Sequence, residues 1–203
     1  MNRRNFISNA AAGVGASYLA PGAFADLLDT PHRAEATDTV VLGKTGIRTS
    51  RLAMGTGTIG FGGSSNQTRM GQLTRLLRTG YDRGLIFFDT ADSYGSHPEV
   101  SAAISGLPRD KVVIMTKCDS RDPKQAKADI DRYRRELKTD HIDILLIHCV
   151  TEGDWTARYR GVMDVFSEAK EKGVIRTHGV SCHTIEALRA AAASPWWKSI
   201  SCA

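Results

Sequence analysis

Short apolar runs alternate with amphipathic stretches along most of this 203-residue chain. The runs are rich in β-branched and aromatic residues and lie at about 52–56, 85–89, 112–117, 142–148 and 174–181. The stretches between them repeat apolar residues at helical spacing, which gives each stretch a single apolar face. Strands that alternate with helices predict a parallel sheet. The glycines after the first run (Gly57, Gly60, Gly62 and Gly63) are not set between strand and helix as a dinucleotide-binding G-x-G-x-x-G fingerprint, and we expect them to let the backbone approach a ligand or to make a flexible loop. Without that fingerprint, a barrel is favoured over a doubly wound sheet.

Helices and a hairpin follow from the same spacing. Three helices are predicted around the sets Met70, Leu73, Leu77 and Tyr81; Ala126, Ile130, Tyr133 and Leu137; and Trp155, Tyr159, Val162, Phe166 and Ala169. A further helix is expected to start near Thr184, and residues 197–203 are expected to begin a sixth strand. At residues 40–50, a Gly-containing turn between two short β-rich segments predicts a hairpin.

The first 25 residues have the pattern of an export signal. Arg3 and Arg4 precede a mild apolar stretch, and Ala23-Phe24-Ala25 offers a cleavage site. The arginine pair resembles a twin-arginine (Tat) signal, which implies an exported or periplasmic protein with the Tat machinery as a partner. A flexible N-terminus or a Sec signal with two basic residues are the alternatives. The stretch is too short and too weakly apolar for a stable membrane span. We interpret residues 26–38 as a linker and residues 39–203 as one domain.

Charge and cysteine spacing narrow the classes of function. Without residues 1–25 the chain carries 25 basic against 22 acidic residues, an excess too small to argue for nucleic acid. We predict no metal site, because there is no C-x-x-C pair among Cys118, Cys149, Cys182 and Cys202. The first three each follow a polar residue at a strand end, so alternation along the strand predicts small apolar packing under the helices. A metal or a disulfide is the alternative.

Three of the apolar runs end on a residue that can take part in proton chemistry. They lead into Asp89, Lys117 and His148, and Tyr94 follows five residues after Asp89. Enzymes of this architecture place their chemistry at the carboxyl ends of parallel strands, so the four side chains are predicted to share one mouth. Each alone also has an ordinary explanation: a loop cap for the Asp, a solvated Lys, turn packing for the Tyr, and a hydrogen-bonded core residue for the His.

A phenol beside an ammonium group suits the reduction of a carbonyl, because the carbonyl oxygen needs a proton as a hydride arrives. A tyrosine with a pKa of about 10 is a poor acid near neutral pH, but a nearby ammonium favours the phenolate and lowers that pKa. We therefore expect Tyr94 to be the general acid and Lys117 to lower its pKa. Asp89 is expected to pair with Lys117, and His148 to orient the carbonyl or help to pass the proton.

The same residues resemble the aldo-keto reductase family. Residues 88–95 resemble its D-T-A-x-x-Y-G motif, Thr116-Lys117 its lysine strand end, and residues 143–148 its D-x-x-x-x-H strand. Residues 173–181 resemble its G-x-I-R…G-V-S strand, and residues 42–46 resemble the hairpin that plugs its barrel. The resemblance runs from about residue 39 to 190. It implies an α/β fold of the (β/α)8 TIM-barrel type and the same catalytic roles for the four residues.

The resemblance also implies NADP(H) as the cofactor and a small-molecule carbonyl as the substrate. It places Ser181 and residue 182 at the nicotinamide carboxamide, although Cys182 stands where the family has Asn. Asp89, Gly55 and Thr56, at the ends of the first two barrel strands, are the other cofactor-binding candidates.

A complete barrel of this kind typically needs about 250 residues. We therefore expect an incomplete barrel, with strands 1 to 5 and the start of strand 6, from a truncated product or a partial sequence. Open edges predict that the polypeptide alone is poorly stable or needs a partner. Two other functions stay open: a non-catalytic binding or regulatory protein on a partial barrel, and a lyase or isomerase that uses no nicotinamide.

Overall fold

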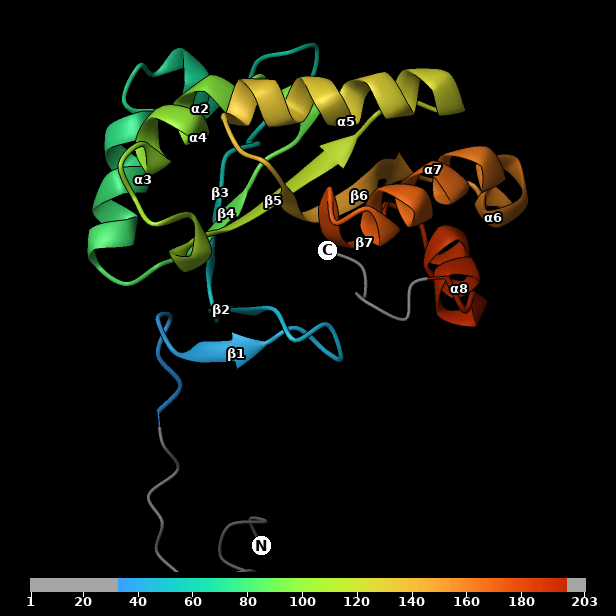
Figure 1. Cartoon of the computed structure of the whole chain (residues 1–203), viewed down its shortest axis with the longest axis horizontal. Helices are drawn as coiled ribbons and strands as arrows, with labels where there is room; N and C mark the ends of the chain where they lie inside the picture. Colours follow the sequence, from blue (N-terminus) through green and yellow to red (C-terminus); the bar gives the residue numbers. More distant parts are fainter. Residues whose placement is uncertain (1–32, 197–203) are drawn as a thin grey trace, which may run out of the picture. The chain divides into compact units, whose positions relative to one another are not determined.

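The computed structural model describes residues 33–196, and the elements given below lie in the unit that begins at Glu35 (Figure 1). At its centre is a parallel sheet in which every strand lies beside the one that precedes it in the sequence, in the order β3-β4-β5-β6-β7. The strands are β3 (Ala53–Gly55), β4 (Phe87–Asp89), β5 (Val113–Cys118), β6 (Ile142–Val150) and β7 (Ile175–Cys182). Their order and positions confirm the predicted alternation of strands and helices.

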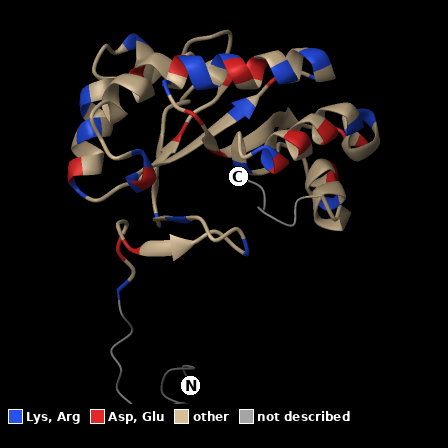
Figure 2. Cartoon of the chain, in the orientation of Figure 1, with Lys and Arg blue, Asp and Glu red and all other residues tan. Residues whose placement is uncertain are grey.

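Helices connect the strands and cover one face of the sheet (Figure 1). They are α2 (Asn66–Arg69), α3 (Leu73–Asp82), α4 (His97–Ile104), α5 (Pro123–Leu137), α6 (Trp155–Arg158), α7 (Arg160–Glu171) and α8 (Ile185–Ala193). Basic and acidic side chains alternate along the outer surface of α5 and form no face of one sign there (Figure 2). Such a mixed surface is typical of a solvated helix.

Two apolar cores lie on opposite faces of the sheet. The larger core, between sheet and helices, contains the buried residues Phe88, Ile114, Leu145 and Phe166. The smaller core covers the inner face and consists of Ile47, Val113, Met115, Ile144 and Leu146. Ile47 comes from the hairpin in which β1 (Thr39–Val41) pairs with β2 (Arg48–Ser50), so the predicted hairpin is confirmed and packs against the inner face.

A buried carboxylate binds the neighbouring strands together at the amino end of β6. Asp143 is fully buried and accepts hydrogen bonds from Arg109 and Arg176, each at 2.7 Å. It also accepts one from the backbone N–H of Ile114 in β5, at 2.9 Å. Because Arg176 belongs to β7, this one side chain binds groups on both strands that flank β6. The register of the central strands is therefore fixed at this end by charge as well as by the backbone.

Two helix predictions differ from the structure, and one helix was not predicted. The helix predicted to include Met70 begins only at Leu73, because Gly71 has a left-handed backbone (φ 63°) that ends α2, and Met70 is 69% exposed. The stripe from Trp155 to Ala169 is divided at Tyr159 into α6 and α7. Helix α4 was not predicted, because it spans only about two turns and begins with His-Pro, which leaves too few apolar positions to show a helical spacing.

The cysteine prediction holds at one position and fails at another. Cys118 is free and fully buried in the helix-facing core, as expected. The prediction of apolar packing is wrong for Cys149, which is exposed. The pairing of β6 with β7 is irregular between Ile147 and Val150, and Cys149 has a left-handed backbone (φ 51°) that turns it out of the alternation. Cys182 is partly buried against the helix-facing core.

The predicted Tat signal (1–25) and the predicted sixth strand (197–203) lie outside the described residues. Between residues 33 and 196, the longest helices are too short or too polar to cross a bilayer. Across the same residues, no cluster of three or more His, Cys, Asp or Glu side chains could hold a metal ion.

Candidate active site

Lys117 and Asp89 form an ion pair at the carboxyl ends of adjacent strands. Their contact joins Lys117 Nζ to Asp89 Oδ1, and Lys117 Nζ also donates to the carbonyl oxygen of Thr90 at 3.0 Å. The Lys117 side chain is 4% exposed and the Asp89 side chain 28%. Both residues alternate onto the inner face of the sheet, beside Met115 and Phe87, which explains why they meet there. A buried ammonium in this position has its charge compensated by one carboxylate and one carbonyl.

Tyr94 lies directly over this ion pair. It ends a short 3₁₀ turn (Asp92–Tyr94) that follows β4, and Gly95 with a left-handed backbone (φ 62°) ends the turn. Lys117 Nζ is 4.9 Å from the centre of the Tyr94 ring. The ring of His148, from β6, meets the Tyr94 ring edge-on with centres 5.5 Å apart. The structure thus brings all four predicted catalytic side chains together.

The glycine-rich loop at 57–63 packs against the Tyr94 ring. A side chain at Gly57 or Gly60 would overlap the ring, and at Gly57 an added Cβ would lie 2.7 Å from Tyr94 Cδ2 and closer to two other ring atoms. The sequence suggested that these glycines approach a ligand or make a flexible loop. At these two positions they instead allow the backbone to approach the proposed acid itself.

The pKa of Tyr94 is raised above its ordinary value, opposite to the expected effect of Lys117. Burial is the main cause, and the negative charges of Asp89 and Asp119 add to it. The charge of Lys117 is already balanced by Asp89, which is why the ammonium does not dominate. The expectation of a lowered pKa is therefore wrong for this arrangement. A raised pKa keeps the phenol protonated near neutral pH, and a proton donor must begin in that state.

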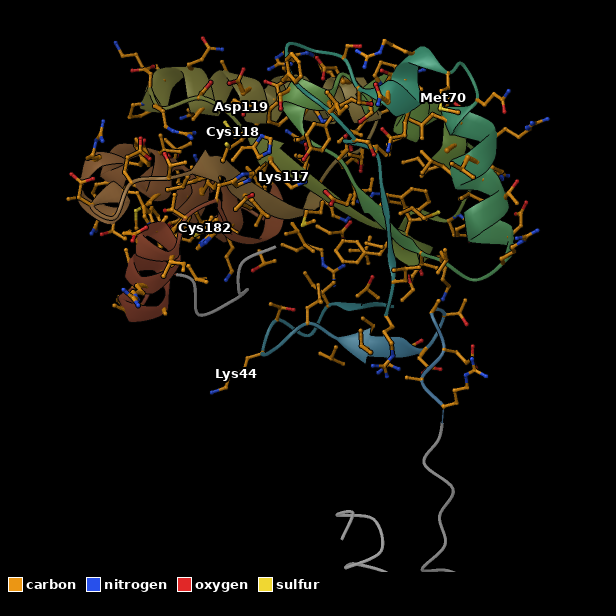
Figure 3. The ribbon with its side chains drawn as sticks, turned by 180° about the vertical axis from the view of Figure 1, so that it is seen from behind. Lys44, Met70, Lys117, Cys118, Asp119 and Cys182 are labelled. Carbon is orange, nitrogen blue, oxygen red and sulfur yellow. The ribbon has the colours of Figure 1, made fainter. Side chains whose placement is uncertain are left out.

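His148 is held by two residues that the sequence reasoning missed. Its Nδ1 lies 2.8 Å from Asp119 Oδ1 and 3.3 Å from Ser93 Oγ. Asp119 follows β5 directly, two positions after Lys117 (Figure 3). Because side chains two positions apart on a strand point to the same side, this spacing could have identified Asp119 from the sequence.

The predicted cofactor-binding residues differ in the face of the sheet on which they lie and in whether they are accessible to a ligand. Ser181 is buried, and alternation along β7 places it on the inner face of the sheet, because its neighbours Val180 and Cys182 lie against the helix-facing core. Its hydroxyl has one long contact, 3.4 Å to His183 Nε2. Thr56 is fully buried and its hydroxyl donates to the Asp89 carbonyl, so it supports β4 from within the protein. Gly55 has open space where a side chain would be. Cys182 lies on the opposite face of β7, against the helix-facing core, and is not brought to the others.

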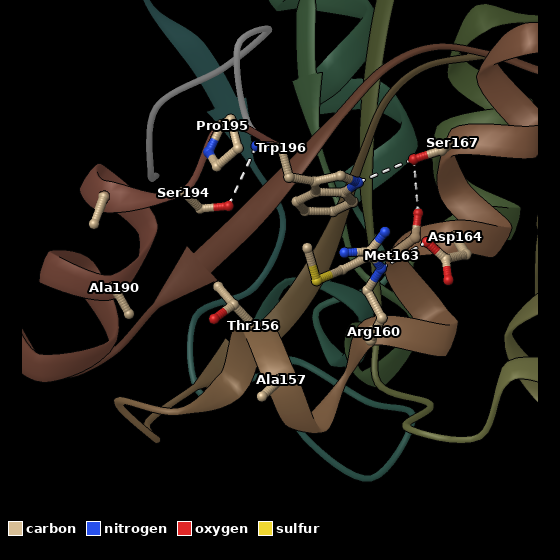
Figure 4. Close-up of a pocket in the computed structure, with 11 residues that line it drawn as sticks. Thr156, Ala157, Arg160, Met163, Asp164, Ser167, Ala190, Ser194, Pro195 and Trp196 are labelled. Carbon is tan, nitrogen blue, oxygen red and sulfur yellow. Dashed lines mark hydrogen bonds and ion pairs between the residues drawn. The ribbon is translucent and has the colours of Figure 1, made fainter.

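A separate cavity of about 700 Å³ lies between α6, α7 and α8 (Figure 4). Trp196 borders it and donates to Ser167 at 3.0 Å, and its charged lining includes the exposed pair Arg160 and Asp164. None of the four predicted catalytic residues lines this cavity. The four candidate catalytic residues therefore lie at the strand ends and not in this cavity.

Comparison with known proteins identifies the family to which this chain is similar. A family model described as "Aldo/keto reductase family" matches residues 53–202. The methylglyoxal reductase DkgB of Salmonella typhi is 31% identical over 122 residues, which are 58% of this chain and 45% of that protein. The aldo-keto reductase YhdN of Bacillus subtilis is 30% identical over 159 residues, which are 70% of this chain and 46% of that protein. The chain thus spans about half the length of these curated relatives.

Solved structures show the same fold. An aldo/keto reductase from Brucella melitensis matches with a TM-score of 0.60 and 26% identity, over 75% of this chain and 57% of that one. The holo form of an aldo-keto reductase from Bacillus halodurans matches with a TM-score of 0.59 over 72% of this chain and 51% of that one, and at 24% identity it supports the fold alone. These matches confirm the predicted (β/α)8 class, of which five parallel strands are described here. Since the family model covers most of the sequence, this chain belongs to the aldo/keto reductase family.

Proposed function

We propose that the protein reduces aldehydes or ketones to alcohols with NADPH, and that Tyr94 supplies the proton. The observation that carries the proposal is the position of Lys117 Nζ, 4.9 Å from the centre of the Tyr94 ring and paired with Asp89. As the proton leaves, the phenol oxygen gains negative charge, and the adjacent ammonium stabilises that charge. An isolated Lys-Asp pair that served only the fold would not need a phenol above it.

The residues at the strand ends fit a nicotinamide nucleotide at one point. The buried hydroxyl of Ser181 has only a long contact within the described part of the chain, so it can hydrogen-bond to the nicotinamide carboxamide. When bound, the reduced nicotinamide supplies the hydride that the carbonyl carbon accepts. The open space at Gly55 leaves room for a ligand beside Asp89, whereas Cys182 faces away from this region.

The roles of the four side chains follow from their contacts. Tyr94 gives its proton to the carbonyl oxygen and ends as a phenolate. Lys117 stabilises that phenolate, and Asp89 keeps the ammonium beneath the ring. His148, whose ring meets the Tyr94 ring edge-on, orients the same oxygen. Burial of Lys117 excludes water from the ammonium, which strengthens each of these charge interactions.

The purified protein tests the proposal in an assay of carbonyl-dependent NADPH oxidation. Tyr94→Phe is expected to abolish turnover while NADPH still binds, as judged by nucleotide fluorescence. Tyr81→Phe, a matched change on α3 away from the site, is expected to retain it. Carbonyl binding without nucleotide oxidation would instead support a binding or regulatory protein. Consumption of the carbonyl without any nucleotide would support a lyase or isomerase.

We further propose that the protein is exported through the Tat machinery. The support is the sequence of residues 1–25 alone, with its arginine pair and small-residue cleavage site. Replacing both arginines with lysines in a fusion to a reporter that must fold before export is expected to retain the reporter in the cytoplasm. Export that survives this change would contradict the Tat proposal.

A further inference from the structure

Asp119 holds the imidazole of His148 through one ring nitrogen. Asp119 Oδ1 is 2.8 Å from His148 Nδ1, and the His148 side chain is only 7% exposed. The second oxygen, Asp119 Oδ2, accepts a hydrogen bond from the backbone N–H of Ser93 at 3.1 Å. The carboxylate is therefore fixed by the turn that carries Tyr94 as well as by the imidazole. It is not a freely rotating surface acid.

The surroundings of His148 restrict it further. The Arg121 guanidinium donates to the carbonyl oxygen of His148 at 2.5 Å and to that of Asp119 at 3.0 Å, which ties the two strand ends together. The Tyr94 ring lies on one side, and the His183 ring lies 6.3 Å away, centre to centre. Tyr94, His183, Ser93 and Asp119 thus contact or face the imidazole, and Arg121 holds the backbone of the same residue.

The chemistry of the pair determines where the imidazole proton lies. Burial alone would raise the pKa of Asp119, but the hydrogen bond and charge of His148 and the Ser93 N–H outweigh burial and lower it. Asp119 is therefore ionised near neutral pH and can only accept hydrogen bonds. Nδ1 of His148 must then carry a proton. A neutral imidazole has only one, so its Nε2 is left as an acceptor.

Nε2 is the ring atom that remains available to a ligand. Within residues 33–196, every hydrogen bond of the His148 ring is made through Nδ1. An acceptor Nε2 can bind the O–H of an alcohol or a phenol. It can donate to a carbonyl oxygen only after the ring takes up a second proton. The protonation of the ring therefore decides which side of an alcohol–carbonyl couple it recognises.

We propose that Asp119 is a positioning residue that fixes the Nδ1–H tautomer of His148 and thereby presents Nε2 to the hydroxyl of an alcohol when the ring is neutral. The identity of that ligand rests on the proposed function, but the tautomer does not. Tyr94 and Lys117 act on the proton that is transferred, whereas Asp119 acts through its contact with His148, besides the effect of its charge on the pKa of Tyr94. Asp119 lies outside the motifs by which this chain resembles the aldo-keto reductases.

Nitrogen-15 NMR of the histidine side chains tests the tautomer directly. The purified protein is labelled at histidine and studied at alkaline pH, with the His148 signals assigned from their loss in His148→Gln. We expect a protonated-type shift at Nδ1 and an unprotonated-type shift at Nε2. In Asp119→Ala the proton is expected to move largely to Nε2. Ser93→Ala, which removes the 3.3 Å hydroxyl, and Asp110→Ala, which removes an exposed carboxylate elsewhere, are expected to retain the wild-type pattern.

The outcomes are distinct from those of the activity assay. A wild-type ring protonated at Nε2 overturns the proposal, as does an Asp119→Ala variant with the wild-type pattern. A shift in Ser93→Ala without one in Asp119→Ala also overturns it, because the hydroxyl would then be the partner. If Asp119→Ala does not fold, the wild-type spectrum still decides. Absence of NADPH oxidation would contradict the proposed function but leave the tautomer result standing.

Discussion

Replacing Gly57 with alanine should displace the Tyr94 ring and remove most of the reductase activity. An added Cβ would lie 2.7 Å from Tyr94 Cδ2, with two other ring atoms closer, whereas ordinary contact begins at 3.4 Å. The ring or the loop must therefore move by about 0.7 Å at least, and by on the order of 1 Å to clear the closest atoms. Misplacement of a reacting group by about 1 Å can cost about 100-fold in rate. We expect a loss of that size in kcat/KM for carbonyl-dependent NADPH oxidation.

Stability should change much less than activity. Tyr94 is half-buried and can swing towards solvent, so we expect the unfolding free energy in urea to fall by about 1–3 kcal/mol, as for a modest overpacking. Gly153→Ala is the matched control, because its new methyl would meet Glu186 Cβ at an ordinary 3.4 Å. Activity of Gly57→Ala within a factor of two of wild type would refute the reasoning.

Three further predictions concern stability. Burial lowers the pKa of His178 to about 4, so its contribution is complete above about pH 6.5 and is lost as the pH falls towards 4; between pH 6.5 and pH 4 the unfolding free energy in urea should fall by up to about 3 kcal/mol more in wild type than in His178→Asn, and equal falls would contradict this. Phe88→Ala removes a fully buried ring and should cost about 3–5 kcal/mol in urea unfolding, with a loss under 1 kcal/mol counting against the packing described. Lys138 ends α5 with a left-handed backbone (φ 51°), so Lys138→Gly should raise the unfolding free energy by up to about 1 kcal/mol, and a decrease would contradict the strain argument.

The sequence was sufficient for the strand positions and for the four central side chains. Buried parallel strands are continuous apolar runs, so a run that ends at Asp89, Lys117 or His148 marks both the strand and its carboxyl end. Strand pairing then brings these ends to one edge regardless of the helices between them. This is why Lys117 and Asp89 meet although 28 positions separate them.

Features that depend on three-dimensional packing could not be predicted in the same way. The glycines of the loop at 57–63 look alike in the sequence, and only the position of the Tyr94 ring shows what Gly57 and Gly60 permit. The raised pKa of Tyr94 depends on burial and on the combined charges around it, whereas the sequence suggested only the nearest ammonium. The exposure of Cys149 follows from one irregular pairing position in β6.

The two-arginine cluster around Asp143 has a consequence for how this protein can change over time. The ion pairs of Asp143 with Arg109 and Arg176 lie at the amino ends of the strands, and the side chains proposed for chemistry lie at their carboxyl ends. A strand that is anchored at its start cannot slide when its far end is altered. Loops after the strands can then be lengthened or exchanged, as a new substrate would require, while Lys117 stays opposite Asp89. Substitution of Asp143 or its two arginines would instead be expected to shift the strands, and with them all the side chains proposed for chemistry.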